Sequence, residues 1–171
     1  MTTALGRLAI AALCFAFAGE AAAREIRHPA RGTPAFVVQV PDDWTNEVDP
    51  DRNLILASPD SSTAFSLTLG SFSGDLEDAA KGMLNVAKAT PPTNKTPTSI
   101  SGQAGFLFES TMKTDNGAML RLNMAIVRVR EKGFMSCTQL QHENATARKR
   151  QLADGVMRSV RIVGATPGSE R

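Results

Sequence analysis

The sequence contains few of the residues from which catalytic and nucleic-acid-binding sites are usually built. Among its 171 residues there is no tyrosine, one tryptophan, two histidines and two cysteines. With no tyrosine and a single tryptophan, we expect no aromatic platform on which the bases of single-stranded nucleic acid would stack. The formal net charge is only +2, which also gives no reason to expect nucleic-acid binding.

The N-terminal 23 residues have the pattern of a secretory signal peptide. Arg7 precedes a short apolar run over residues 8–18, and small residues then lead to Ala21-Ala22-Ala23. The apolar run is too short to span a bilayer comfortably, although an uncleaved anchor is the alternative interpretation. We therefore expect cleavage after Ala23, a periplasmic or secreted location, and no membrane span in the mature protein.

Cleavage at this site leaves Cys137 as the one cysteine, because Cys14 is removed. An intramolecular disulfide is then impossible, and Cys137 is either buried or available for an intermolecular bond. Its position within a predicted strand favours a buried free thiol. The mature part has 148 residues (171 − 23), enough for one domain with its own core.

Composition divides the mature chain into three parts. Residues 24–34 are polar and contain two prolines and a glycine, so we expect a flexible lead-in. Residues 35–163 are predicted to form a single α+β domain, and 164–171 a disordered tail. We expect a monomer, with no metal and no cofactor.

Periodicity predicts the elements that precede the central part of this domain. Strands are expected at 35–40, 52–58 and 63–70, and an amphipathic helix over 75–88 begins at the N-cap residue Asp75. Residues 90–98 include three prolines and are predicted to be an irregular loop.

An antiparallel meander over residues 103–142 is the organising element. A three-residue turn, Asp115-Asn116-Gly117, requires a left-handed conformation at Gly117. This turn places three apolar pairs on one face, and a slip by one residue would invert the faces. The pairs are Phe106 with Ile126, Phe108 with Met124, and Met112 with Leu120.

A second turn at 131–133 is predicted to pair Arg130 with Phe134, Val127 with Cys137, and His142 with Leu122. Residues 124–127 are apolar on both sides of the strand, so both faces of the sheet need cover. We expect an α+β fold in which an antiparallel sheet of about six strands has helices on both faces. The second helix covers residues 144–160, with Leu152, Val156 and Val160 facing inward.

Three stretches carry a resemblance to a known group of proteins. They are Phe-Val-Val-Gln-Val-Pro-Asp-Asp-Trp at 36–44, Ile-Ser-Gly-Gln-Ala at 100–104, and the closing helix that ends near Ser159. With the element order over about residues 35–163, they resemble the PsbP-like superfamily and its bacterial periplasmic, DcrB-like members. The resemblance implies an α/β/α sandwich and accessory, assembly or binding roles, and it transfers no functional residue.

The sequence contains no recognisable catalytic or metal-binding constellation. His28 and His142 are far apart and lack a thiolate pair, which disfavours zinc. Ser136 is not in a nucleophile elbow and is interpreted as a packing residue. The acidic residues between Asp42 and Asp51 lack the spacing of an EF-hand loop, so a solvated turn is favoured over calcium binding.

Two features are candidates for binding a partner. Arg148, Lys149 and Arg150, joined by Arg128 and Arg130, would form a basic patch for an acidic envelope protein or an anionic surface. A solvated helix face is the alternative. Trp44 would line a groove, or it would plug the sheet edge. The sequence thus predicts a non-enzymatic envelope protein, with a periplasmic hydrolase as the alternative.

Overall fold

The computed structural model describes residues 22–130 and 132–165. Most of the predicted signal peptide and six residues of the predicted tail lie outside the described residues. Cleavage after Ala23 therefore stays a prediction.

Ten strands and two helices are formed by the described residues. In chain order they are β1 (Ala23–His28), β2 (Ala35–Pro41), β3 (Thr45–Val48), β4 (Leu54–Ala57), β5 (Thr63–Ser71), α1 (Leu76–Val86), β6 (Asn94–Ile100), β7 (Gln103–Lys113), β8 (Met119–Arg130), β9 (Gly133–His142), α2 (Ala147–Ser159) and β10 (Arg161–Val163).

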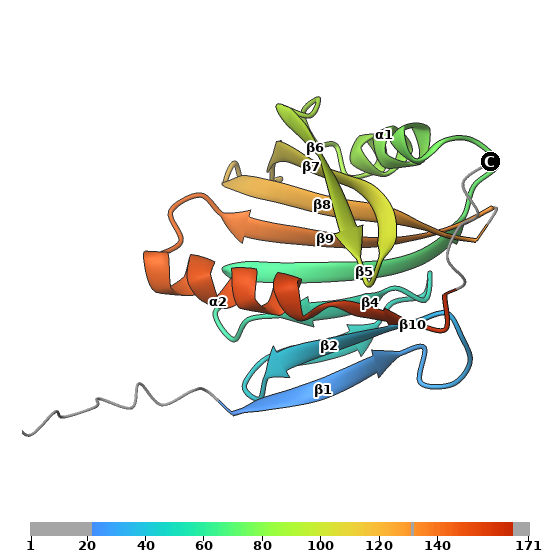
Figure 1. Ribbon diagram of the computed structural model, residues 1–171. Helices are drawn as coiled ribbons and strands as arrows, with labels where there is room; N and C mark the ends of the chain where they lie inside the picture. The colour runs from blue at the N-terminus through green and yellow to red at the C-terminus, as the bar shows by residue number, and fades with distance from the viewer. Residues whose placement is uncertain (1–21, 131, 166–171) are drawn as a thin grey trace, which may run out of the picture.

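The strands form two antiparallel sheets (Figure 1). The larger sheet has seven strands in the order β3-β4-β5-β9-β8-β7-β6, and the smaller one has three in the order β1-β2-β10. The α+β class is confirmed. The expected antiparallel sheet of about six strands corresponds to the larger sheet, but the expectation that β2 belongs to it is wrong, because β2 pairs with β1 and β10 in a second sheet.

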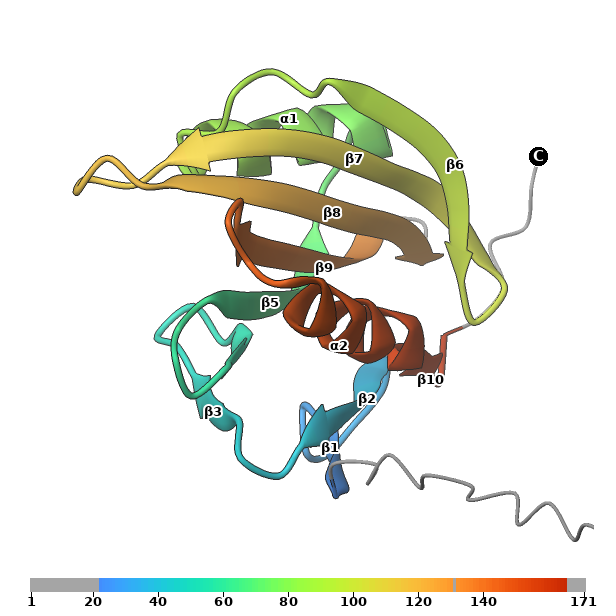
Figure 2. The ribbon, with the colours of Figure 1, turned by 90° about the vertical axis from the view of Figure 1, so that its left-hand side faces the viewer.

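The two helices cover opposite faces of the seven-stranded sheet. Helix α1 packs on alternate residues of β7 and β8, among them Phe108, Leu122 and Met124. The other face packs against α2 and β2 together, in the larger of the two apolar clusters. Figure 2 shows α2 and the smaller sheet beneath strands β7, β8 and β9 of the larger one. The two-sided burial expected from residues 124–127 is thus present, but a second sheet shares one side with α2.

The first meander turn has the geometry expected from the sequence. Gly117 has a φ of +86°, and its N–H donates to the Thr114 carbonyl at 2.9 Å. The three expected pairs on the α1 face are all present: Phe106 with Ile126, Phe108 with Met124, and Met112 with Leu120.

The second turn differs from the expected register by two residues. Arg128 pairs with Phe134, Val127 pairs with Met135 and His142 pairs with Leu120, because a bulge lies between Arg128 and Arg130. A shift of two keeps every side chain on its face. The predicted core faces are therefore correct although the predicted partners are wrong.

The prediction of a flexible lead-in is wrong for residues 24–28, because they belong to β1. All six residues of β1 pair with β2, and His28 is buried. The Arg24 guanidinium reinforces this strand by donating to the Asp42 and Trp44 carbonyls, both at 2.6 Å. The domain therefore begins before residue 35.

The predicted irregular loop at 90–98 contains most of β6, which is an edge strand. Pro97 is tolerated there because an edge strand leaves one row of N–H groups unpaired. Residues 161–163, which follow the predicted second helix, form β10 beside β2.

Helix α1 begins as predicted, because the Asp75 side chain accepts from the Asp78 N–H at 2.8 Å. Helix α2 is capped by Thr146 and is shorter than expected. Val156 faces inward, but Leu152 is 40% exposed and Ala153 occupies the core instead.

Candidate functional site

Trp44 is part of the core. It is only 4% exposed and lies 6.0 Å from the Phe65 ring, centroid to centroid. This burial favours the interpretation in which Trp44 plugs the sheet edge. The small exposed part of the indole also lines a depression, so the groove-lining alternative stays a prediction.

The five basic residues expected to form one patch do not lie together. Arg128 and Arg130 are near the start of β9, whereas Arg148, Lys149 and Arg150 follow its end, roughly 30 Å away along ten residues of strand.

Four of these five basic side chains contact the protein itself. Arg128 donates to the Gly74 carbonyl at 3.0 Å and Arg130 to the Thr33 carbonyl at 2.7 Å. Arg150 donates to the Ala145 carbonyl at 2.6 Å, and Lys149 forms an ion pair with Asp60. Arg128 and Arg130 therefore do not join the basic patch predicted from the sequence, and a partner-binding role of Arg148, Lys149 and Arg150 stays a prediction.

A depression of about 240 Å³ lies where the β2–β3 turn, the β4–β5 turn and α2 meet. Its lining comes from Asp43 and Trp44, from residues 58–60 and 62–63, and from Lys149 and Leu152. Trp44, Ser58 and Thr63 are buried, whereas Asp43 and Leu152 are exposed. We call this site the Trp44 depression.

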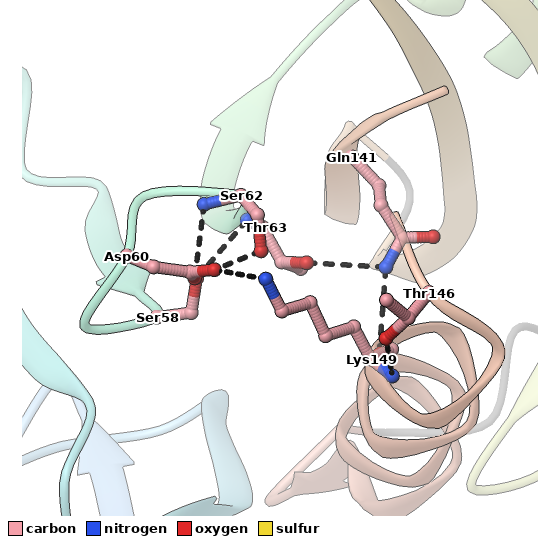
Figure 3. A network of polar contacts seen from close by, with 7 residues as sticks. All are labelled: Ser58, Asp60, Ser62, Thr63, Gln141, Thr146 and Lys149. Carbon is pink, nitrogen blue, oxygen red and sulfur yellow. Dashed lines mark hydrogen bonds and ion pairs between the residues drawn. The ribbon is translucent and has the colours of Figure 1, made fainter. Parts of the chain in front are cut away.

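A polar network fixes one wall of the Trp44 depression (Figure 3). Asp60 accepts from the Ser58 hydroxyl at 2.9 Å, from the Ser62 hydroxyl at 2.8 Å, and from the Lys149 ammonium. Behind it, the buried Gln141 amide donates to the Thr63 hydroxyl at 3.1 Å. The network joins two segments 89 residues apart in the chain, so it holds the β4–β5 turn against α2.

The network also determines the chemistry of Asp60. The hydrogen bond from Lys149, followed by those from Ser62 and Ser58, holds the pKa of the Asp60 carboxyl far below its usual range. Asp60 is therefore ionised under physiological conditions and is a very weak base.

The acidic turn is stabilised internally at Asp49. Its carboxylate accepts from the Asn53 N–H and from the Asn53 side-chain amide, both at 2.8 Å. These bonds lower the pKa of Asp49. Within the described part of the chain, no three His, Cys, Asp or Glu side chains gather closely enough to hold a metal ion.

A second depression, of about 340 Å³, lies at the other end of the sheet. Thr33 and Pro34 line one side, and Leu69, Val129 and Phe134 line the other. Arg130 bridges to Thr33 there, so its guanidinium ties the β1–β2 loop to the sheet.

Two potential nucleophiles, Ser136 and Cys137, are buried in the core. Ser136 and Cys137 are each 0% exposed, and burial raises the pKa of the Cys137 thiol to about 12. His142 is six residues from Ser136 on the same strand, which is about 20 Å. His28 donates from Nε2 to the Arg52 carbonyl at 2.8 Å, so it has a structural partner.

The burial of Cys137 confirms one sequence prediction. The thiol is free, and its Sγ lies 3.3 Å from the Met157 Sδ in the cluster that also contains Val127 and Met135. None of the helices in the described ranges is long and apolar enough to cross a bilayer.

Comparison with known proteins identifies the fold. No family model and no curated protein matches the sequence. The structure is similar to that of the PsbP protein (CyanoP) from the cyanobacterium Synechocystis sp. PCC 6803, with a TM-score of 0.60 and 12% identity over 85% of this chain and 95% of that one. It is also similar to LpqN of Mycobacterium tuberculosis, a protein involved in cell envelope biogenesis, with a TM-score of 0.53 and 14% identity over 82% of this chain and 91% of that one.

A protein from Bacteroides thetaiotaomicron VPI-5482 aligns with a TM-score of 0.49 and 14% identity over 80% of this chain. The alignment covers 47% of that protein, so this chain spans about half of its length. The first two similarities show that this is an α+β protein with the PsbP-like fold, as the sequence resemblance implied.

Sequence reasoning selected Trp44 and Lys149 but did not place them at one site. The residues it missed are Asp60, the serines beside it, and Leu152. The Ser58-Pro59-Asp60 stretch gives a turn signal, but its pairing with α2 depends on contacts across 89 residues of chain.

Proposed function

We propose that this chain is an exported accessory or binding protein of the cell envelope that does not catalyse a reaction. The observation that carries the proposal is the contrast between two buried potential nucleophiles, Ser136 and Cys137, and a surface depression bounded by a polar network. Ser136 and Cys137 are fully enclosed, whereas the Trp44 depression is open and held by a polar network.

Two further features support the envelope setting. The N-terminal residues have the pattern of a secretory signal. The fold is shared with LpqN, which is described as involved in cell envelope biogenesis. A protein partner is favoured over an anionic surface, because the five basic side chains lie in two groups and four of them contact the chain itself.

The hydrolase alternative gains no support from the Trp44 depression. A hydroxyl nucleophile needs a base that accepts its proton. Ser58 and Ser62 do donate to Asp60, but the pKa of that carboxyl is far below the usual range. A carboxylate this weakly basic is poorly matched to general base catalysis near neutral pH.

Two measurements test the proposal. Mass spectrometry of the protein from an envelope fraction should find Arg24 as the N-terminal residue, and Met1 would contradict export. A hydrolase and transferase screen should give no turnover above a heat-denatured control. Turnover that is lost in Ser58→Ala, Ser136→Ala or His142→Ala would replace the binding function with a catalytic one.

A further inference from the structure

We propose that the Trp44 depression is the anchor pocket for a partner protein, and that it receives one large apolar side chain flanked by a lysine or arginine. This inference rests on the proposed binding function and adds the surface and the chemistry of the partner.

The size of the depression favours a single side chain over a free ligand. Pockets for small molecules usually enclose about 300–1,000 Å³. The Trp44 depression encloses about 240 Å³, which is below that range. Protein interfaces concentrate their binding energy where an apolar or aromatic anchor fills such a pocket.

The apolar part of the lining is suited to an anchor of this kind. Trp44 contributes a buried aromatic surface, and Pro59 and Leu152 contribute exposed apolar groups beside it. A single exposed leucine is ordinary on a protein surface. Leu152, however, lines the same depression as Trp44, so an incoming apolar side chain would have both as neighbours.

One wall of the pocket is already held by a polar network in the free protein. Asp60 is held by two serine hydroxyls and by Lys149, and these bonds fix the β4–β5 turn relative to α2. A preorganised pocket loses less conformational entropy on binding than a mobile one. Because Lys149 is paired with Asp60, the charge that a partner meets in the depression depends on the β2–β3 turn on its opposite side.

That opposite side is acidic. Asp43 lines the depression and Asp42 precedes it, and within residues 22–130 and 132–165 neither carboxylate forms an ion pair. Asp60 and Lys149 offset each other's charge, so among the lining residues only Asp43 adds a net negative charge. The Arg24 guanidinium of β1 donates to the Asp42 and Trp44 carbonyls and is not part of the lining. A lysine or arginine next to the apolar anchor would complement the Asp43 carboxylate.

Peptide selection tests this assignment. A random dodecapeptide library without tryptophan is selected on the immobilised mature protein, and enriched peptides are titrated against fluorescence from Trp44, the one tryptophan of the chain. The enriched peptides should share an aromatic or large aliphatic residue beside Lys or Arg. Binding should weaken about tenfold or more in Leu152→Arg. In Asp43→Asn, the loss of affinity should shrink at high salt.

Val86→Arg is the matched control, because Val86 is 87% exposed on α1 and should leave the affinity unchanged. No enrichment, an acidic consensus, or equal binding by Leu152→Arg would overturn the assignment. Such a result would refute the pocket alone, whereas absence from the envelope or catalytic turnover would refute the proposed function.

Discussion

Replacing Gly117 with valine should destabilise the protein through backbone strain alone. The residue closes the turn between β7 and β8 with a φ of +86°. A Cβ placed there would lie 3.7 Å from Lys113 Cε, which is ordinary contact with the flexible end of a side chain. The substitution therefore tests conformation with almost no contribution from packing.

The expected magnitude follows from two opposing terms. An L-residue held in the left-handed region costs roughly 1–2 kcal/mol, and β-branching adds to that strain. Loss of the flexible glycine also lowers the entropy of the unfolded chain, which returns about 0.4–1 kcal/mol. Because the added strain of β-branching offsets this return, we expect Gly117→Val to lower the free energy of unfolding by about 1–2 kcal/mol.

Urea denaturation of the mature protein measures this change, with Gly117→Asn as the matched control. Asparagine adopts the left-handed conformation more readily, so its midpoint should lie between those of the wild type and Gly117→Val. The slope of the transition should stay the same in all three. Superimposed curves for wild type and Gly117→Val would refute the conformational account of this turn.

Three other predictions concern stability and reactivity. Cys137 should react with a thiol reagent only as fast as the protein unfolds, because the side chain is 0% exposed and burial raises its pKa; rapid labelling of the native protein would contradict this. Gly155→Ala should stabilise the protein by about 1 kcal/mol, because no atom lies within 4 Å of the added Cβ on α2; a lower melting temperature would show that the site is constrained. Asp60→Asn should be less stable than wild type at pH 7. Because the folded pKa of Asp60 is depressed, that difference should shrink as the pH falls below about 4, and a constant difference would show that the Asp60 charge is not responsible.

Turn chemistry explains why one hairpin was predicted in full and the next only in part. The Asp115-Asn116-Gly117 stretch contains the residue that its turn requires, so the β7–β8 register follows from local sequence. The bulge between Arg128 and Arg130 has no such local signal, and it moves the β8–β9 register by two residues. Only the alternation of faces, which a shift of two preserves, was predictable there.

Two edge strands, β1 and β6, were also not predicted from the sequence. Four of the six residues of β1 are charged or histidine, so its sequence has no apolar run to mark it as a strand. It forms a strand because all its residues pair with β2 and because the Arg24 guanidinium donates hydrogen bonds to the Asp42 and Trp44 carbonyls. β6 was obscured by Pro97, which a central strand would exclude and an edge strand accepts.

The candidate site depends on tertiary contacts to a greater degree than the fold does. Lys149 was predicted as part of a basic surface, but in the folded chain its ammonium forms an ion pair with the Asp60 carboxylate. Leu152 was predicted to face the core because the assumed helix phase put it there, whereas Ala153 occupies that position. The sequence shows which residue types each segment contains, but it does not predict that the β2–β3 turn, the β4–β5 turn and α2 meet at one depression.

The most direct test of the binding account is photocrosslinking in the intact cell envelope. A photoreactive amino acid is introduced at Leu152, beside the Trp44 depression, or at Val86, which is also exposed but lies on α1. The account predicts a discrete crosslinked protein from position 152 that is absent from position 86 and is reduced by Asp43→Asn. No crosslinked product at position 152, or the same products from both positions, would contradict it.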